Sequence, residues 1–428
     1  MSTHLASLPL RCPNFAASLV VVMCCGCGAR SELVVRMHRV EPLDAIATDG
    51  AALDARDGTG DATPDRGNPD VAPACPDLFL AAGPVTALQA TTGGYATPRL
   101  VARAGGFDLL APATNVEPLG IRARRLYDTP APPGIRFGDV TIVGEGSWTW
   151  AEAGSDGTTL ALGYLADAPT FRAWSGEYVS VARTALVLAT PSVRCAGIAW
   201  AGDRWVTGWG GTPGESWVAE LSPAGMLQSP RPAGVDLSAS APSLGAYGHG
   251  AAWTAPDSRG GVTVVFAPRG RPDVTQRVPV TDTVRSLRIA AWPPDDSAVA
   301  LVWREGSFAV HLAVVREDGT RLVDATVIPS AGWGAHGVEV APFLDGVVIA
   351  DVSCGDADPT AGRIDVHRIG ADGVERGRGA FVPLDCRVSA FLASIAADGV
   401  DVALAWLTPQ GSPRGDMDVN AALLRCTP

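Results

Sequence analysis

The sequence contains no lysine, so all 33 of its basic residues are arginine. Schiff-base catalysis and Walker-type phosphate binding both use the lysine amine, and the absence of lysine excludes them. The formal net charge of −12 also disfavours a nucleic-acid partner, because phosphate binding needs a concentrated basic surface. Much of the acidity lies between Asp44 and Asp70, which leaves the rest of the chain closer to neutral.

Sequence motifs of common catalytic and metal sites are lacking as well. There is no Gly-x-Ser-x-Gly nucleophile elbow, and no Gly-x-Gly-x-x-Gly lies between an expected strand and an expected helix. No two histidines have metal-ligand spacing, so we expect neither a metal site nor a cofactor. Asp156 and the pair Asp295–Asp296 fall in expected hairpin turns, where aspartate is favoured because it accepts hydrogen bonds from nearby backbone N–H groups.

No apolar run near the N-terminus is long enough to span a membrane. Phe15–Met23 is nine residues long, whereas a spanning helix needs about 20 apolar residues. A run of this length is typical of the core of a signal peptide. Three cysteines, Cys24, Cys25 and Cys27, follow it directly.

This segment resembles a bacterial lipoprotein signal, in which a small residue precedes the cysteine that is lipidated. Cys27, preceded by Gly26, fits best, and Cys25 is the alternative. The stretch that begins at Gly28 is similar to the start of myxobacterial surface lipoproteins. The resemblance implies a signal peptide over residues 1–26, export, and an outer membrane lipoprotein held by its acyl chains on the periplasmic side or at the cell surface. An ordinary cleaved signal peptide is the other interpretation.

The segment after the anchor cysteine has almost no large apolar residues from about Val40 to Ala74. Such a segment cannot bury enough surface to offset the conformational entropy of the chain. We therefore expect residues 27–74 to form the lipidated cysteine and a disordered acidic tether.

Residues 75–428 repeat one pattern of short apolar segments separated by turns of Gly, Pro and Asp, which is typical of β-strands. The clearest copy consists of Leu287–Trp292, Ala298–Trp303, Phe308–Val315 and Arg321–Ile328. Four strands that recur roughly every 40–55 residues indicate an all-β protein, a β-propeller.

Seven candidate second strands predict seven four-stranded blades, although their uneven spacing leaves six or eight possible. These strands are centred near Leu109, Ala161, Val206, Val264, Leu301, Ile349 and Ala403. Ala298–Trp303 and Val347–Val352 are continuously apolar, as expected for strands that are covered on both faces. The tryptophans at strand ends are expected to pack between adjacent blades.

The two ends of the repeat region predict ring closure. The last copy stops after its third strand, Asp418–Leu424, and Asp77–Leu88 resembles a missing fourth strand. Pairing of the two would leave no free sheet edge there.

A Cys75–Cys426 disulfide would fit this closure in an exported protein. Cys354 with Cys386 is the second predicted pair and Cys195 the leftover thiol, with swapped pairings still open.

His249 and His336 lie in glycine-rich stretches that could line the mouth of the propeller channel. No catalytic constellation is evident, so the expected function is that of a membrane-anchored surface lipoprotein whose propeller is a binding or scaffold module for protein or polysaccharide. Enzymatic activity stays open. The alternative is a cell-envelope hydrolase or lyase that acts on carbohydrate, with a site that converges only in the fold.

The lipid anchor is testable with single substitutions. Cys27→Ala is expected to move the protein from the membrane fraction to the soluble fraction, because the acyl chains supply the attachment. Cys25→Ala is the matched control and should leave the protein in the membrane fraction. Membrane attachment that persists in both variants would contradict a lipid anchor at either cysteine.

Overall fold

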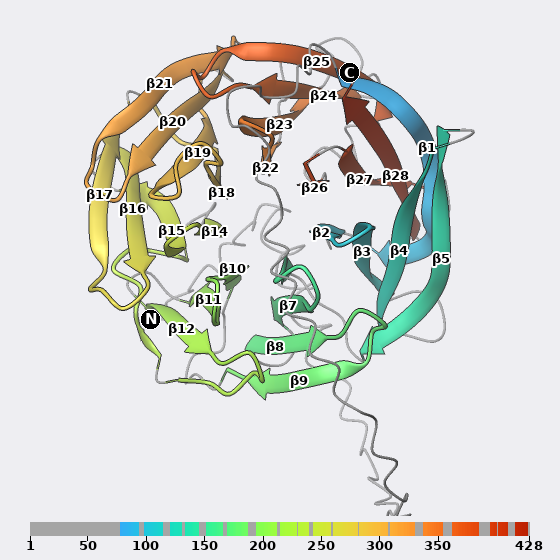
Figure 1. Cartoon of the computed structure of the whole chain (residues 1–428), viewed down its shortest axis with the longest axis horizontal. Helices are drawn as coiled ribbons and strands as arrows, with labels where there is room; N and C mark the ends of the chain where they lie inside the picture. Colours follow the sequence, from blue (N-terminus) through green and yellow to red (C-terminus); the bar gives the residue numbers. More distant parts are fainter. Residues whose placement is uncertain are drawn as a thin grey trace, which may run out of the picture. The chain divides into compact units, whose positions relative to one another are not determined.

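The computed structural model describes residues 78–93, 98–113, 120–130, 133–144, 151–165, 169–186, 194–211, 215–228, 230–238, 243–257, 260–280, 282–306, 309–329, 337–353, 362–384, 394–399, 401–409 and 416–426. These residues form 28 β-strands in seven antiparallel four-stranded sheets, and no helix occurs among them. The sheets are the blades of a closed ring, as Figure 1 shows. The predicted seven-bladed β-propeller is thus confirmed.

Each of the first six blades is a continuous segment of the chain. Blade 1 contains β2 (Arg99–Arg103), β3 (Gly106–Ala113), β4 (Gly120–Pro130) and β5 (Pro133–Gly144). Blade 2 contains β6 (Ala151–Ser155), β7 (Leu160–Leu165), β8 (Pro169–Trp174) and β9 (Ser180–Ala185). Blade 3 contains β10 (Arg194–Trp200), β11 (Trp205–Gly210), β12 (Ser216–Leu221) and β13 (Arg231–Pro232).

The remaining blades follow in the same order around the ring. Blade 4 contains β14 (Ser243–Tyr247), β15 (Gly250–Asp257), β16 (Gly261–Pro268) and β17 (Val274–Pro279). Blade 5 contains β18 (Ser286–Ala291), β19 (Ala298–Arg304), β20 (Val310–Arg316) and β21 (Arg321–Ile328). Blade 6 contains β22 (Gly337–Phe343), β23 (Gly346–Ser353), β24 (Gly362–Ile369) and β25 (Glu375–Leu384). Blade 7 contains β26 (Ser394–Ala397), β27 (Asp401–Pro409), β28 (Asp416–Cys426) and β1 (Leu78–Gly93).

The ring is closed by the first and last strands of the described residues. β1 pairs antiparallel with β28, with Leu78 opposite Cys426 and Leu88 opposite Val419. In Figure 1 the blue β1 runs along the rim beside the dark red β28. The predicted closure by an N-terminal fourth strand is therefore confirmed.

The hydrophobic core lies between the blades. The described residues form seven apolar clusters, and each cluster combines residues of two neighbouring blades. Because successive side chains of a strand point to opposite faces, one strand serves two clusters. On β19, Leu301 and Trp303 pack with blade 4, whereas Ala300 and Val302 pack with blade 6. This double burial explains why second strands are continuously apolar.

The tryptophans serve these interfaces, as the sequence predicted. Trp253 lies in the cluster of blades 3 and 4, Trp303 in that of blades 4 and 5, and Trp406 in that of blades 6 and 7. The indole nitrogen of Trp253 donates to the carbonyl of Ala233 in blade 3 at 2.7 Å, so its polar group is satisfied inside the interface. The excess of tryptophan therefore has a structural cause.

One predicted second strand was wrong. Val264 lies on β16, the third strand of blade 4, and the second strand is β15. The sequence of β15, Gly-Ala-Ala-Trp-Thr-Ala-Pro-Asp, has no valine or isoleucine and contains a proline, so it does not stand out as a strand. The β-branched run of β16 was mistaken for it.

Several sequence predictions lie outside the described residues and stay predictions. These are the signal peptide over 1–26, the tether over 27–74, the anchor at Cys27 or Cys25, and the cysteines Cys75, Cys354 and Cys386. Cys195 lies on β10, and Cys426 ends β28 opposite Leu78.

In the part of the chain that the structure describes, no helix has the length and apolar character needed to cross a membrane.

The closure strand offers a test of how far the ring depends on it. Leu88→Ala is expected to lower the free energy of unfolding by about 2–5 kcal/mol, since Leu88 is buried in the cluster of blades 7 and 1. Val85→Ala on the same strand is the control, and because Val85 is exposed it should change stability by less than about 0.5 kcal/mol. Chemical denaturation measures both. Equal effects would contradict a role for β1 in holding the ring together.

Candidate functional site

Charged side chains gather on one face of the ring, which we call the basal face. It carries the turns between the first and second strands and between the third and fourth strands of each blade. Among the described residues, four blades share one ion pair there, between an aspartate near the first turn and an arginine on the third strand. The pairs are Asp108–Arg125, Asp295–Arg316, Asp345–Arg368 and Asp401–Arg425, at 2.5–3.0 Å. In blade 3 the charges are exchanged, with Arg204 near the first turn and Glu220 on the third strand, 2.8 Å apart.

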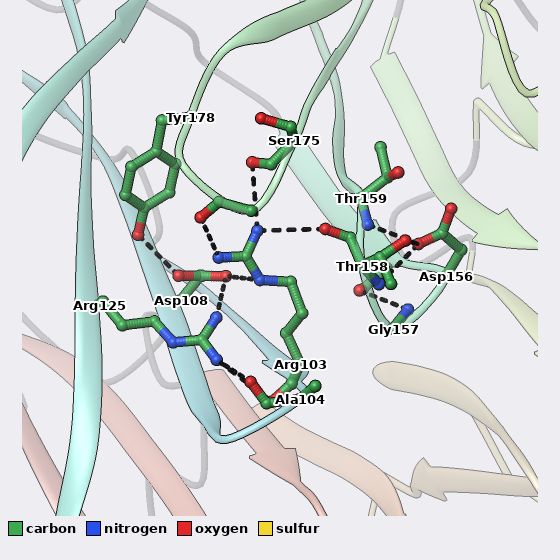
Figure 2. A network of polar contacts seen from close by, with 12 residues as sticks. Arg103, Ala104, Asp108, Arg125, Asp156, Gly157, Thr158, Thr159, Ser175 and Tyr178 are labelled. Atoms are coloured by element: carbon green, nitrogen blue, oxygen red, sulfur yellow. Dashed lines mark hydrogen bonds and ion pairs between the residues drawn. The ribbon is translucent and has the colours of Figure 1, made fainter. Parts of the chain in front are cut away.

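The Asp108–Arg125 pair belongs to a network of polar contacts that joins blades 1 and 2 (Figure 2). Asp108 is fully buried and lies 2.8 Å from Nε of Arg103 and 3.0 Å from Nη1 of Arg125. It also accepts a hydrogen bond from the hydroxyl of Tyr178 at 2.6 Å. Burial and this contact raise the pKa of Tyr178, so the phenol keeps its proton and remains a donor.

Arg103 completes the link between the two blades. Its guanidinium donates to the carbonyl oxygens of Thr158, Ser175 and Gly176 in blade 2. Because Arg103 and Asp108 are both buried and engaged by several protein groups, this network holds blades together rather than offering groups to a ligand.

The aspartates of two hairpin turns have the local role expected from the sequence. Asp156 accepts hydrogen bonds from the backbone of Thr158 and Thr159, which lowers its pKa although burial opposes this. Asp295 accepts from the backbone and hydroxyl of Ser297. Both carboxylates therefore stabilise turns.

Among the described residues, the first strands of the blades carry two ion pairs that join neighbouring blades. Arg99 of blade 1 lies 2.7 Å from Glu152 of blade 2, and Arg288 of blade 5 lies 2.8 Å from Glu339 of blade 6. Burial raises the pKa of Glu152, while Arg99 and Arg288 act in the opposite direction. Each carboxylate is engaged by an arginine of a neighbouring blade, so the pairs act as links between blades.

The basal face is different at blades 3 and 4, where it is hollowed into two adjoining pockets. The outer pocket, of about 450 Å³, is lined by Arg204, Glu220, Arg231 and Asp273 among others. The inner pocket, of about 300 Å³, includes His249. Arg269 and Arg271, in the turn between β16 and β17, line both pockets.

A series of ion pairs in the outer pocket connects blade 4 with blade 3 at two points. Arg269 contacts Asp203 at 2.8 Å, and Asp203 contacts Arg204 at 2.9 Å. Arg204 contacts Glu220 at 2.8 Å, and Arg231 pairs with Asp273. The turn of blade 4 is thus fixed against blade 3 by charges at both of its ends.

Glu317 of blade 5 organises the inner pocket. Its carboxylate is 2.7 Å from Nη2 of Arg271 and 3.1 Å from Nδ1 of His249, and it accepts a hydrogen bond from the hydroxyl of Tyr247 at 3.0 Å. Burial and the contact with Glu317 raise the pKa of Tyr247, so the phenol stays protonated. His249 and Arg271 are therefore held in place by one nearly buried carboxylate.

Of the two histidines singled out in the sequence, His249 lies on the turn between the first and second strands of blade 4 and half exposed in the inner pocket. His336 lies outside the described residues. Among the residues that the structure describes, no group of three or more His, Cys, Asp or Glu side chains could hold a metal ion.

Sequence reasoning missed Arg269, Arg271 and Glu317. A signal was present, because Arg269-Gly-Arg-Pro-Asp273 places three charges in a Gly- and Pro-containing turn that follows an uncharged strand. The partners of this turn come from blades 3 and 5, and the sequence gives no indication of which of its charges they meet.

The structural role of the blade 1–2 network is testable. Asp108→Ala is expected to lower the free energy of unfolding by about 3–5 kcal/mol, because it leaves two buried guanidinium groups without their carboxylate. Asp372→Ala removes an exposed ion pair with Arg376 on the same face and should cost less than about 1 kcal/mol. Thermal or chemical denaturation compares them, and an Asp108 variant as stable as the control would argue against this role.

Comparison with known proteins identifies no family for this chain. No protein-family model matches the chain, and no curated protein matches it. Among solved structures, the chain is similar to Hsv2 of Kluyveromyces lactis, with 10% identity, a TM-score of 0.44, and coverage of 78% of this chain and 100% of the other. It is also similar to BBS1N from a complex with ARL6DN, with 9% identity, a TM-score of 0.45, and coverage of 81% and 97%. A mutant of AofleA from Arthrobotrys oligospora has 10% identity, a TM-score of 0.43, and coverage of 70% and 95%. At these identities the likeness concerns the fold alone.

Proposed function

We propose that this chain is an exported lipoprotein, anchored through Cys27, whose propeller is a binding module for polysaccharide or protein of the cell envelope. The N-terminal sequence supports the anchor, and the composition of residues 27–74 supports a tether that gives the propeller reach. A propeller suits a binding or scaffold role because its turns and loops present ligand-contacting groups on a rigid ring.

The observation that carries the binding role is the pair of pockets at blades 3 and 4. Their volumes lie within or near the range of small-ligand sites. In the network of Asp108, on the same face, the charges are buried and satisfied within the protein. At the pockets the guanidinium groups of Arg269 and Arg271 are exposed beside an open hollow, although one nitrogen of each is held by a carboxylate.

A binding role also agrees with the contacts of the carboxylates, which are paired with arginines. General acid–base catalysis on sugars uses two carboxyl groups that face the scissile bond. On the first strands of the blades, Glu152 and Glu339 each contact an arginine, and at the pockets Glu317 and Asp273 do the same. These groups position cations, so the proposal is recognition rather than hydrolysis.

Affinity capture tests the proposal. The full chain, immobilised and exposed to a native envelope extract, is expected to retain a ligand in a specific and saturable manner. The double variant Arg269→Gln/Arg271→Gln should retain much less, because the exposed donors of both pockets are lost. Retained glycan and protein are assayed separately.

Arg376→Gln is the matched control, since Arg376 is also exposed and paired with a carboxylate on the basal face of another blade. Retention should be unchanged in this variant. If the full chain retains nothing, or if all three proteins retain the same material, the pockets are not the binding site and the proposal is wrong.

A further inference from the structure

Three cations of the two pockets are more exposed than the carboxylates they contact. The side chains of Arg269, Arg271 and His249 are 66%, 56% and 46% exposed. Their carboxylate partners are less accessible, with Asp203 at 36% and Glu317 at 10%. At these three side chains a ligand that approaches from solvent therefore meets N–H donors before it meets the carboxylates that hold them, although the pockets contain similar numbers of cations and carboxylates.

The carboxylates also orient these donors. Arg269 is held through Nε by Asp203, and Arg271 through Nη2 by Glu317. Among the described residues, no side-chain contact is seen for the remaining nitrogens of either guanidinium. A guanidinium fixed at one edge can offer its other N–H groups to an oxyanion with less loss of side-chain entropy than a free arginine.

We propose that the two pockets bind an acidic polysaccharide, with successive carboxylates of the sugar chain accepting hydrogen bonds from Arg269 and Arg271. This inference rests on the proposed binding function and names its ligand. His249 is placed to contact the carboxylate that enters the inner pocket, because its Nδ1 faces Glu317 and its side chain is half exposed there.

The lining favours a polysaccharide over an acidic protein segment. Protein interfaces depend on aromatic and aliphatic anchors that enter well-packed apolar pockets. The two pockets are lined mainly by charged side chains and glycine, and their apolar members are Ala201, Ala267 and Pro268. Tyr247 and Trp253 lie beneath the surface and are buried. A hydrophilic chain with regularly spaced carboxylates meets this lining without an apolar anchor.

The test uses a defined uronic-acid oligomer with the full chain. Isothermal titration with oligogalacturonate in the presence of EDTA is expected to show saturable binding. The fully methyl-esterified oligomer has the same sugar backbone without the charges, and it should bind at least about tenfold more weakly because hydrogen bonds to charged groups are lost.

Single substitutions locate the binding. Arg269→Gln and Arg271→Gln are each expected to weaken oligogalacturonate binding about tenfold, and Arg376→Gln to leave it unchanged. The unfolding midpoint of each variant is measured in parallel, and we expect it to stay the same because these side chains are exposed. His249→Asn should weaken binding less than either arginine substitution.

Three results would overturn the inference. These are equal binding of the charged and esterified oligomers, equal binding by the Arg269 and Arg376 variants, or tighter binding of poly-L-glutamate than of oligogalacturonate, which would identify an acidic peptide as the ligand. If envelope capture depends on Arg269 and Arg271 while oligogalacturonate does not bind, this inference fails and the proposed function stands. If envelope capture itself is absent, the proposed function fails.

Discussion

The structure depends on the burial of each blade on both of its faces. A single four-stranded sheet of this protein has apolar side chains on two sides and cannot cover either one by itself. Each apolar cluster is built by two neighbouring blades, and strands such as β19 contribute to two clusters at once. The ring is complete only because β1 adds the fourth strand to blade 7 and packs Leu88 into the cluster shared with blade 1. The ring must therefore close for the apolar faces of all seven blades to be buried.

The charges of the basal face follow from the same geometry. Where strands end, an aspartate near one turn and an arginine on the third strand are brought to ion-pair distance, and four blades use this pair. Between blades 1 and 2 the charges are buried and each has several partners, so they join the blades. Between blades 3 and 5 the long turn of blade 4 carries its arginines outward, and the same kind of pair borders an open hollow. The difference between a structural link and a candidate binding site is thus one of exposure, not of residue type.

The arrangement of blades could be predicted from the sequence where the strands are β-branched and apolar on both faces, as in Ala298–Trp303. The prediction failed in blade 4, because β15 combines glycine, alanine and proline while β16 has the stronger strand pattern. The prediction was correct at the two ends of the repeat region. The last repeat there has only three strands and a single extra strand precedes the first repeat, so pairing of the two leaves no free sheet edge. His249 was singled out for its glycine-rich context, whereas Glu317, 68 residues further on, had no such signal.

The sequence by itself determined the all-β class, the repeat, the closure and the burial of tryptophan, since these follow from short apolar segments that recur between turns of Gly, Pro and Asp. Only the tertiary structure decided which charges meet. Asp203, Arg269 and Glu317 belong to three different blades, and their distances depend on how neighbouring sheets pack. Local sequence patterns report on neighbours along a strand or a turn. The two pockets are formed between blades, where no such pattern extends.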